Sequence, residues 1–325
     1  PDVAIADEGG DHVRTVIVPA EWTGDRVILR VGAAESAIDV FIDGTHVGFS
    51  TDSRLPAEFD LTDAAVPGQP LTVALRVHRW SASSWLEDQD MWWMAGVHRS
   101  VVLYRRPRAH IADVGVTTAS IDAQGLAVVT VEVAASRPLD IGTGALVAVV
   151  DDEGQRATVK LDRPVVDGRS GTVSGSVEVE VPNARTWTAE TPNLVTVHVE
   201  LSASAAGSSE PLDTATISTG IRTVSVSDGR LLVNGVPVTI RGVNRHDHYP
   251  EGGRVVDEEL LAEDIRLMKA HNFNAIRTAH YPHDERLYDL CDRAGLYVVD
   301  EANLECHGLV RDLVSERLSG QLAPS

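Results

Sequence analysis

An apolar run near the end of the chain stops abruptly in acidic residues and a histidine. The segment "LYVVDEANLECHG", residues 296–308, continues after its apolar part with Asp300, Glu301, Glu305 and His307. Carboxylates beside an imidazole are costly to bury unless a cation or a hydrogen-bond donor pairs with them. If the backbone is extended at 305–307, Glu305 and His307 point to one face and Cys306 points away. The pattern favours a hard cation such as Mg²⁺ or Mn²⁺, with a structural Glu–His pair as the alternative.

Two earlier apolar runs end in the same kinds of side chain. Polar and ionisable groups follow the runs near 242 and 276, namely Asn244, Arg245, His246, Asp247, His248, Arg277 and His280. A single histidine at a strand end is more often a satisfied structural group than a catalytic one. Three successive strand ends that carry such groups indicate a site, because the strands of a parallel barrel end on one rim.

Two segments between these strand ends have helical periodicity. Residues 257–271 place Leu261, Ile265 and Met268 at helical spacing, and Asp257 stands where a capping residue is expected. Residues 284–294 place a second set on one helical face, namely Leu287, Leu290, Cys291 and Ala294. Gly295 then stands at the expected C-terminal stop. The sequence therefore predicts two amphipathic helices.

Strands are predicted on both sides of these helices, at 273–280 and 296–303, after a hairpin-like segment at 229–244. Strand, helix, strand, helix, strand is typical of a parallel sheet covered by helices. Residues 222–325 are 325 − 222 + 1 = 104 residues, whereas a (β/α)₈ TIM barrel takes roughly 250. The segment therefore corresponds to the first part of such a barrel, truncated here.

The first two thirds of the chain carry short β-type runs separated by turn residues. Within residues 1–106, the pair Asp43-Gly44 in an alternating run predicts a hairpin. This region is typical of an antiparallel sandwich of the jelly-roll kind whose N-terminal part is missing. Residues 107–221 predict a separate immunoglobulin-like β-sandwich with a spacer role. The predicted fold class is multidomain β plus α/β, with the barrel start at 222–325.

The composition argues against several classes of partner. Among 325 residues, 28 are basic and 48 acidic, a formal net charge of −20, which disfavours nucleic acids and anionic membranes. The two cysteines, Cys291 and Cys306, are too few for a disulfide framework and fit a reducing compartment, so we predict a cytoplasmic location. The sequence contains no apolar run of about 18 residues, which is the length that would predict a membrane-spanning helix. A signal peptide before residue 1 stays open.

The segment "FNAIRTAHYPHDERLYDLCDRAGLYVV", residues 273–299, resembles the signature of the family-2 glycoside hydrolases. It matches that pattern from Asn274 through Arg277, at "HYP" (280–282), at Asp292 and at Gly295. Four other stretches resemble the β-galactosidase branch: "GFSTDSRLPAEFDL", "RWSASSWLEDQDMWWMAGVHR", "RGVNRHDHYP" and "DEANLECHG". The resemblance implies that the jelly-roll sandwich of residues 1–106 is a sugar-binding-like (galactose-binding-like) domain. The middle sandwich matches only by position and type. The resemblance implies retaining hydrolysis of terminal non-reducing β-D-galactose in β-galactosides such as lactose, by a protein of which this chain is an internal fragment.

The resemblance also implies a role for each matched residue. Asp90 aligns with an aspartate that binds Na⁺ and a galactose hydroxyl, and Glu305 and His307 align with two Mg²⁺ ligands. His246 and His280 align with histidines that bind the sugar and stabilise the transition state, while Arg277 aligns with an arginine that orients the nucleophile. The family's acid/base and nucleophile glutamates fall on later strands, beyond this chain. A homo-oligomer is implied for the full-length protein.

Two other functions remain open from the sequence. A β-glucuronidase of the same family would need a carboxylate-binding group where "DQDMW" supplies Asp90. A non-catalytic carbohydrate-binding protein would account for the absence of both glutamates. A gene that continues past Ser325 into an Asn-Glu pair would favour the enzyme.

Overall fold

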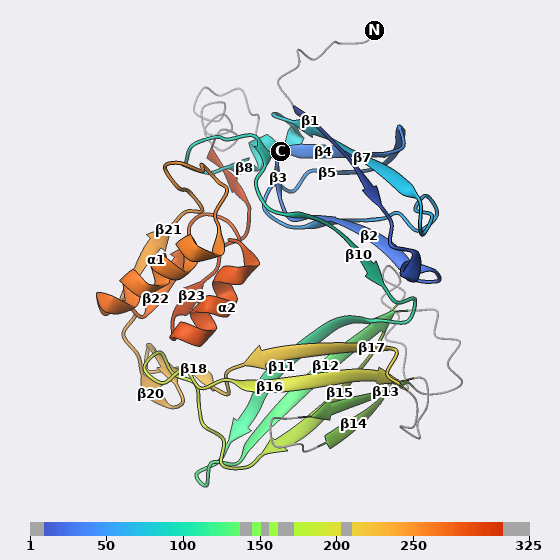
Figure 1. Cartoon of the computed structure of the whole chain (residues 1–325). Helices are drawn as coiled ribbons and strands as arrows, with labels where there is room; N and C mark the ends of the chain where they lie inside the picture. The colour runs from blue at the N-terminus through green and yellow to red at the C-terminus, as the bar shows by residue number, and fades with distance from the viewer. Residues whose placement is uncertain (1–9, 137–144, 151–155, 162–171, 203–209, 308–325) are drawn as a thin grey trace, which may run out of the picture.

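The computed structural model describes residues 10–136, 145–150, 156–161, 172–202 and 210–307. These residues form two β-sandwiches and a smaller α/β unit that lies beside both of them (Figure 1). The predicted fold class is confirmed. None of the described helices is long and apolar enough to cross a membrane.

The first sandwich packs a four-stranded sheet, in the order β1-β7-β4-β5, against a three-stranded sheet, β10-β2-β6. Asp43 and Gly44 have φ angles of 47° and 82°, so the predicted hairpin joins β4 to β5. Alternate side chains of both sheets, such as Leu29, Val40 and Leu75, fill one core. The elements are β1 (Gly10–Ile17), η1 (Ala20–Trp22), β2 (Arg26–Val31), β3 (Ala34–Glu35), β4 (Ala37–Ile42), β5 (Thr45–Ser50), β6 (Ala57–Asp60), β7 (Pro70–His78), η2 (Ala82–Trp85), β8 (Glu87–Asp88), β9 (Gly96–Val97) and β10 (Val101–Arg106).

The second sandwich pairs the sheet β11-β12-β15 with the sheet β14-β13-β16-β17. Every neighbouring pair of strands in it is antiparallel. Its core is rich in valine, as in the fully buried Val131 and Val199, which suits β-branched side chains between two pleated sheets. The strands are β11 (Ile111–Ile121), β12 (Ala127–Ser136), β13 (Ala145–Val150), β14 (Arg156–Leu161), β15 (Thr172–Val181), β16 (Val195–Ser202) and β17 (Asp213–Thr219).

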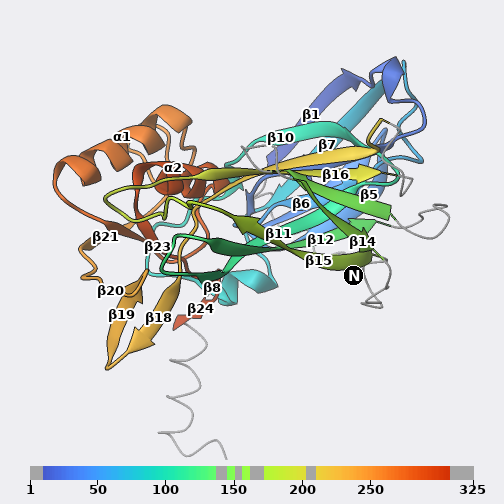
Figure 2. The ribbon, with the colours of Figure 1, turned by 90° about the horizontal axis from the view of Figure 1, so that it is seen from below.

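The α/β unit begins with a small antiparallel sheet, which projects away from α1 (Figure 2). A parallel sheet in the order β21-β22-β23 follows. Along the chain, the two predicted helices connect β21 to β22 and β22 to β23. The elements are β18 (Val224–Ser227), β19 (Arg230–Val233), β20 (Val236–Pro237), β21 (Gly242–Arg245), α1 (Glu258–Ala270), β22 (Ala275–Thr278), α2 (Glu285–Ala294), β23 (Tyr297–Val299) and β24 (Glu305–Cys306).

Two predicted strands are shorter than expected. The strands predicted at 273–280 and 296–303 form ladders only at Ala275–Thr278 and Tyr297–Val299. Beyond these points side chains replace the ladder, since the hydroxyl of Thr278 donates to Asp300 at 2.7 Å and accepts from the backbone N–H of Glu301 at 3.3 Å. The residues that were predicted as strand but follow these ladders form the loops at the strand ends.

The two helices cover one face of the parallel sheet as their periodicity predicts. The carboxylate of Asp257 accepts from the backbone N–H of Leu260 at 2.8 Å and so caps α1. Leu261 of α1 and Leu287 of α2 are fully buried in one core, together with Ile276 of β22. The helices thus hold the sheet, and with it the strand ends.

Gly295 ends α2 and also joins the α/β unit to the second sandwich. Its φ is 78°, and a Cβ there would lie 2.4 Å from the carbonyl oxygen of Ala189. Lys269 spans the same junction, because its Nζ donates to the carbonyl oxygens of Ala189 at 2.8 Å and Gly295 at 3.0 Å. Because of this close approach, Gly295 has no room for a side chain.

We therefore expect Gly295→Ala to lower the free energy of unfolding by about 2–4 kcal/mol, since a left-handed alanine is strained and the added methyl overlaps backbone. Gly229→Ala is the matched control, because Gly229 has φ 71° but open space around its missing Cβ. Gly229→Ala should lower the free energy of unfolding by only about 1–2 kcal/mol, the cost of a left-handed backbone conformation for alanine. Urea unfolding of both variants measures the difference, and equal losses would contradict the close approach to Ala189.

Candidate active site at the ends of three parallel strands

Arg277 connects the ends of β21, β22 and β23. Its Nε donates to the Oε1 atom of Glu301, which follows β23. Its Nη1 donates to the Oδ1 atom of Asn244 on β21 at 3.3 Å, and its Nη2 lies 3.3 Å from the Nδ1 atom of His280. The structure therefore brings the predicted residues Arg277 and His280 together on the predicted rim, with Glu301 between them.

The imidazole rings of three histidines lie side by side along this rim. The ring centroids of His246 and His280 are 5.4 Å apart in an edge-to-face arrangement. His248 continues the row at 5.8 Å from His246 and meets the ring of Trp92, from the first sandwich, at 5.8 Å. At the other end, the Nδ1 atom of His280 lies 3.3 Å from the Oε2 atom of Glu301. The row therefore runs from the α/β unit to the first sandwich.

The local electrostatics keep two of these rings neutral. Burial, followed by the neighbouring His280, lowers the pKa of His246. Burial and then Arg254 lower the pKa of His248 to about 4. A neutral imidazole offers one N–H donor and one acceptor. The buried Nδ1 atom of His246 and Nε2 atom of His248 have no hydrogen-bond partner among the described residues.

Such unpartnered atoms indicate a site for a polar ligand. Leaving a buried polar atom without a partner costs about 1–3 kcal/mol, so native structures usually satisfy it with protein, water or ligand. Ligand hydroxyl groups could satisfy both histidine atoms, because a hydroxyl both donates and accepts.

Asp90 lies exposed in the loop after β8. No hydrogen bond or ion pair joins its carboxylate to another described residue. Its segment is nevertheless held against the third strand-end loop, because β8 and β24 form a parallel ladder that pairs Glu87 with Glu305. The side-chain amide of the neighbouring Gln89 also donates to the Oδ1 atom of Asn303 at 2.8 Å. The structure thus places Asp90 beside the loop of the predicted metal ligands, with no hydrogen bond or ion pair to His246 or His280 among the described contacts.

Glu305 and His307 lie together, but not through strand alternation, because the backbone is helical at His307. The Oε1 atom of Glu305 is 2.7 Å from the Nε2 atom of His307, although β24 itself ends at Cys306. Their side chains are 29% and 60% exposed, so solvent reaches both. Within the residues that the structure describes, no group of three or more His, Cys, Asp or Glu side chains could hold a metal ion. The pair still fits Mg²⁺, because this ion keeps several waters and uses few protein ligands.

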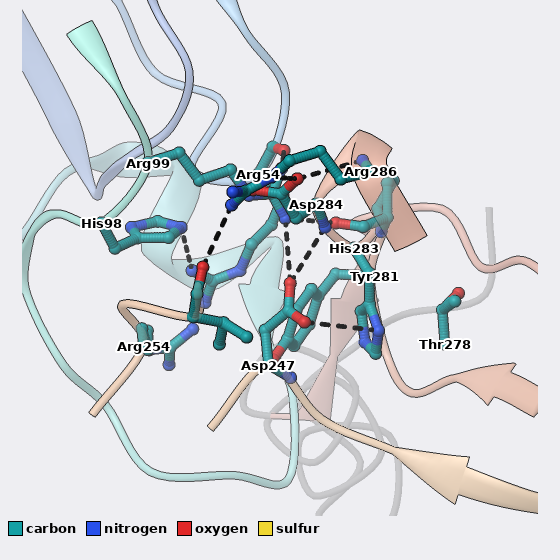
Figure 3. A network of polar contacts seen from close by, with 12 residues as sticks. Arg54, His98, Arg99, Asp247, Arg254, Thr278, Tyr281, His283, Asp284 and Arg286 are labelled. Atoms are coloured by element: carbon teal, nitrogen blue, oxygen red, sulfur yellow. Dashed lines mark hydrogen bonds and ion pairs between the residues drawn. The ribbon is translucent and has the colours of Figure 1, made fainter. Parts of the chain in front are cut away.

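A buried cluster of charged side chains links the first sandwich to the α/β unit and was not predicted from the sequence; Figure 3 labels two of its members, Arg54 and Arg254. Glu35, on β3 of the first sandwich, pairs with Arg54 at 3.0 Å and with Arg254 of the α/β unit at 3.1 Å. All three side chains are at most 3% exposed. Burial raises the pKa of Glu35, against the opposing effect of the two arginines. Glu35 and Arg254 are 254 − 35 = 219 positions apart, so no local pattern reveals their pairing.

Three sequence profiles of one family match the chain in succession. The profile described as "Glycosyl hydrolases family 2, sugar binding domain" matches residues 1–107. That of "Glycosyl hydrolases family 2" matches residues 109–222, and "Glycosyl hydrolases family 2, TIM barrel domain" matches residues 224–321. Together they span both sandwiches and the α/β unit.

Curated relatives carry the same similarity along almost the whole chain. A β-galactosidase of Alteromonas mediterranea is 42% identical over 315 residues, which are 95% of this chain and 30% of that protein. A β-galactosidase of Vibrio vulnificus is 44% identical over 308 residues, 92% of this chain and 29% of that protein. The chain thus spans about 30% of the length of these relatives.

Solved structures agree on the fold. A β-glucuronidase of Bifidobacterium dentium, complexed with coumarin-3-O-glucuronide, superposes with a TM-score of 0.81 at 28% identity, covering 91% of this chain and 53% of that one. A β-glucuronidase of Ruminococcus gnavus gives 0.76 at 24% identity, covering 91% and 50%, and at that identity it shows the fold alone. The profiles, the relatives and the fold agree domain by domain, and the chain belongs to family 2 of the glycosyl hydrolases.

Proposed function

We propose that the protein containing this chain is a retaining β-galactosidase that removes terminal non-reducing β-D-galactose from β-galactosides such as lactose. The observation that carries the proposal is the meeting of His246, Arg277 and His280 on one rim with Glu301. The curated β-galactosidases, 41–44% identical over more than nine tenths of the chain, support galactose as the sugar.

In this proposal, the residues of this chain bind and orient the sugar. Retaining glycosidases use a carboxylate nucleophile and a carboxylic acid around an oxocarbenium-like transition state, and hydrogen bonds to sugar hydroxyls strengthen on the way to it. His246 and His280 make those hydrogen bonds, and Arg277 keeps His280 and Glu301 in place. We assign the nucleophile and the acid to glutamates on later strands of the barrel in the whole protein.

We further propose that Glu305 and His307 hold Mg²⁺ (or Mn²⁺) and that Asp90 binds Na⁺ and a galactose hydroxyl. The contact between Glu305 and His307, the exposure of both and the nature of their donor atoms support the first site. The exposed carboxylate of Asp90 supports the second site, because it would supply an oxygen ligand for Na⁺. A divalent cation bound at the pair would supply positive charge that fixes a nearby carboxylic acid and tunes its ionisation.

Glu305→Gln is expected to weaken Mg²⁺ binding by about 10–100-fold, because an anionic ligand becomes a neutral one. Isothermal titration of the metal-free protein measures the affinity directly, and activity titrated against Mg²⁺ should shift in parallel. Glu251→Gln, at an exposed glutamate in the loop before α1, is the control. Unchanged Mg²⁺ affinity in Glu305→Gln would remove this residue from the site.

Turnover by the product of the complete gene tests the proposed function. We expect hydrolysis of p-nitrophenyl β-D-galactoside and little hydrolysis of the corresponding glucuronide. The reverse preference would establish the second candidate, a β-glucuronidase, which the 28% identical structure from Bifidobacterium dentium favours. Galactoside binding without turnover of either compound would establish a non-catalytic carbohydrate-binding protein.

We also propose that the whole protein is a cytoplasmic homo-oligomer. Both cysteines are free, and Cys291 is fully buried, which suits a reducing compartment. Cell fractionation tests the location, and sedimentation of the purified protein tests the oligomeric state.

A further inference from the structure

We propose that Asp247 is a positioning residue: held by Arg245 and by Arg99 of the first sandwich, it fixes the loop that carries His246 against the loop that carries His280. The inference deepens the proposed β-galactosidase function and rests on it for its catalytic meaning. The geometry that carries it lies in buried contacts outside the row of histidine rings.

The contacts of Asp247 join the loop after β21 to the loop after β22 (Figure 3). Its Oδ1 atom accepts from Arg245, and its Oδ2 atom accepts from the backbone N–H of Asp284 at 3.0 Å. Its own backbone N–H donates to the hydroxyl of Tyr281 at 3.0 Å. Asp247 directly follows His246, and Tyr281 directly follows His280. The spacing of the two imidazoles is therefore set by hydrogen bonds between their neighbours in the chain.

The first sandwich holds the same loop from the other side. Arg99 reaches the Oδ2 atom of Asp247 at 3.3 Å and donates to the carbonyl oxygen of Pro282 at 2.9 Å. Its second amino group donates to the carbonyl oxygen of Arg54 at 2.6 Å. The guanidinium of Arg54 lies 4.5 Å from the centre of the Tyr281 ring. The first sandwich therefore holds residues 281–284 in place through Arg99 and Arg54.

Burial and charge make this arrangement rigid. Asp247 is 4% exposed and Tyr281 is 1% exposed. Burial alone would raise the pKa of Asp247, but His283, Arg245 and Arg99 lower it to about 2. At neutral pH the arginines carry this effect, because burial lowers the pKa of His283 to about 4. Asp247 is thus a fixed anion, and moving it would take one of two carboxylate partners from Arg245 and the carboxylate partner from Arg99.

The first test is the kinetics of Asp247→Asn in the complete protein. Asparagine keeps the size but loses the anion, so we expect kcat/KM for a chromogenic galactoside to fall by about 10²-fold with KM changed less than about threefold. Asp264→Asn is the matched control, since Asp264 is the other acceptor of Arg245, at 2.9 Å, but lies 34% exposed on α1. It should leave kcat/KM unchanged. Asp247→Glu, which restores the anion, should recover most of the loss.

The second test does not depend on catalysis. Deuterium exchange at the imidazole C2–H, followed by mass spectrometry, reports the titration of each histidine. In Asp247→Asn, we expect His246 and His280 to exchange faster and the pKa of His246 to rise toward its ordinary value of about 6.5, because the loops admit water. If Asp247→Asn does not fold, Arg99→Lys should show the same changes more weakly, since lysine lacks the planar fork.

The outcomes separate the two proposals. A lower melting temperature with unchanged histidine exchange would overturn the positioning role and leave Asp247 as a stabilising residue. A fall of the His246 pKa would also overturn it, because it would show an effect of charge without movement. If the unsubstituted protein hydrolyses no galactoside, the proposed function fails, and histidine exchange alone then decides whether Asp247 positions the loops.

Discussion

Replacing Arg277 by lysine is expected to lower kcat/KM of the complete protein for a chromogenic β-galactoside by about 10²-fold or more. Arg277 uses three nitrogens for three partners, Glu301, Asn244 and His280, which come from three different strand ends. Lysine keeps the charge but offers a single ammonium group, so it cannot hold all three in place. Most of the loss should appear in kcat, because in the proposed function the displaced His280 would bind the sugar most strongly in the transition state.

Steady-state kinetics together with thermal unfolding measure this effect. The control is Arg266→Lys on the outer face of α1, where the exposed guanidinium pairs with Glu263 and with no other acidic side chain among the described residues. That variant should keep full activity. A melting temperature within a few degrees of the unsubstituted protein, with the loss confined to kcat, would agree with the assignment. A variant that keeps its activity would show that Arg277 is a structural residue of the rim.

Replacing Arg54 by methionine is expected to lower the free energy of unfolding by about 3–5 kcal/mol, the typical cost of removing one partner from a buried ion pair. Among the described residues, Glu35 would then keep Arg254, at 3.1 Å, as its single cationic partner. The contact of Arg54 with the ring of Tyr281 would also disappear. Because this network connects the first sandwich to the α/β unit, both units should become less stable.

The loss should depend on pH. The pKa of Glu35 is already raised by burial, so the folded state holds the proton more tightly than the unfolded state. Stability from such a group is present at low pH and is lost as the pH rises through the raised pKa. Arg54→Met raises this pKa further, so the destabilisation should be larger at pH 8 than at pH 5.

Arg26→Met provides the comparison for Arg54. Arg26 pairs with Asp60 at 2.8 Å, but these side chains are 35% and 43% exposed. Loss of such a surface pair costs about 0–1 kcal/mol. Urea unfolding of Arg54→Met and Arg26→Met at pH 5 and pH 8, each compared with the unsubstituted protein, gives the four losses of unfolding free energy. Equal, pH-independent losses would contradict the importance of burial.

Local patterns in the sequence predicted the elements that position the site. The capping carboxylate of Asp257 and the glycine stop at Gly295 mark helix ends because their roles depend on backbone geometry within a few residues. The apolar faces of α1 and α2 follow from helical spacing alone. Since parallel strands end on one rim, the same patterns also predicted that Arg277 and His280 would meet the residues after β23. The contact between Glu305 and His307, by contrast, does not follow from strand alternation, because β24 ends at Cys306 and the backbone is helical at His307.

The residues that hold these groups in place were decided only by the tertiary structure. Arg99 reaches Asp247 across 148 positions of the chain, and Glu35 reaches Arg254 across 219. Nothing in the sequence near any of these residues indicates its partner, because the pairing arises when two separately folded units come together. Burial then determines the cost of losing a partner, since removing one member of such a pair costs little at the surface and several kcal/mol where water is excluded. The sequence by itself thus determined which groups stand on the rim, and the packing of the first sandwich against the α/β unit decided which buried charges fix them there.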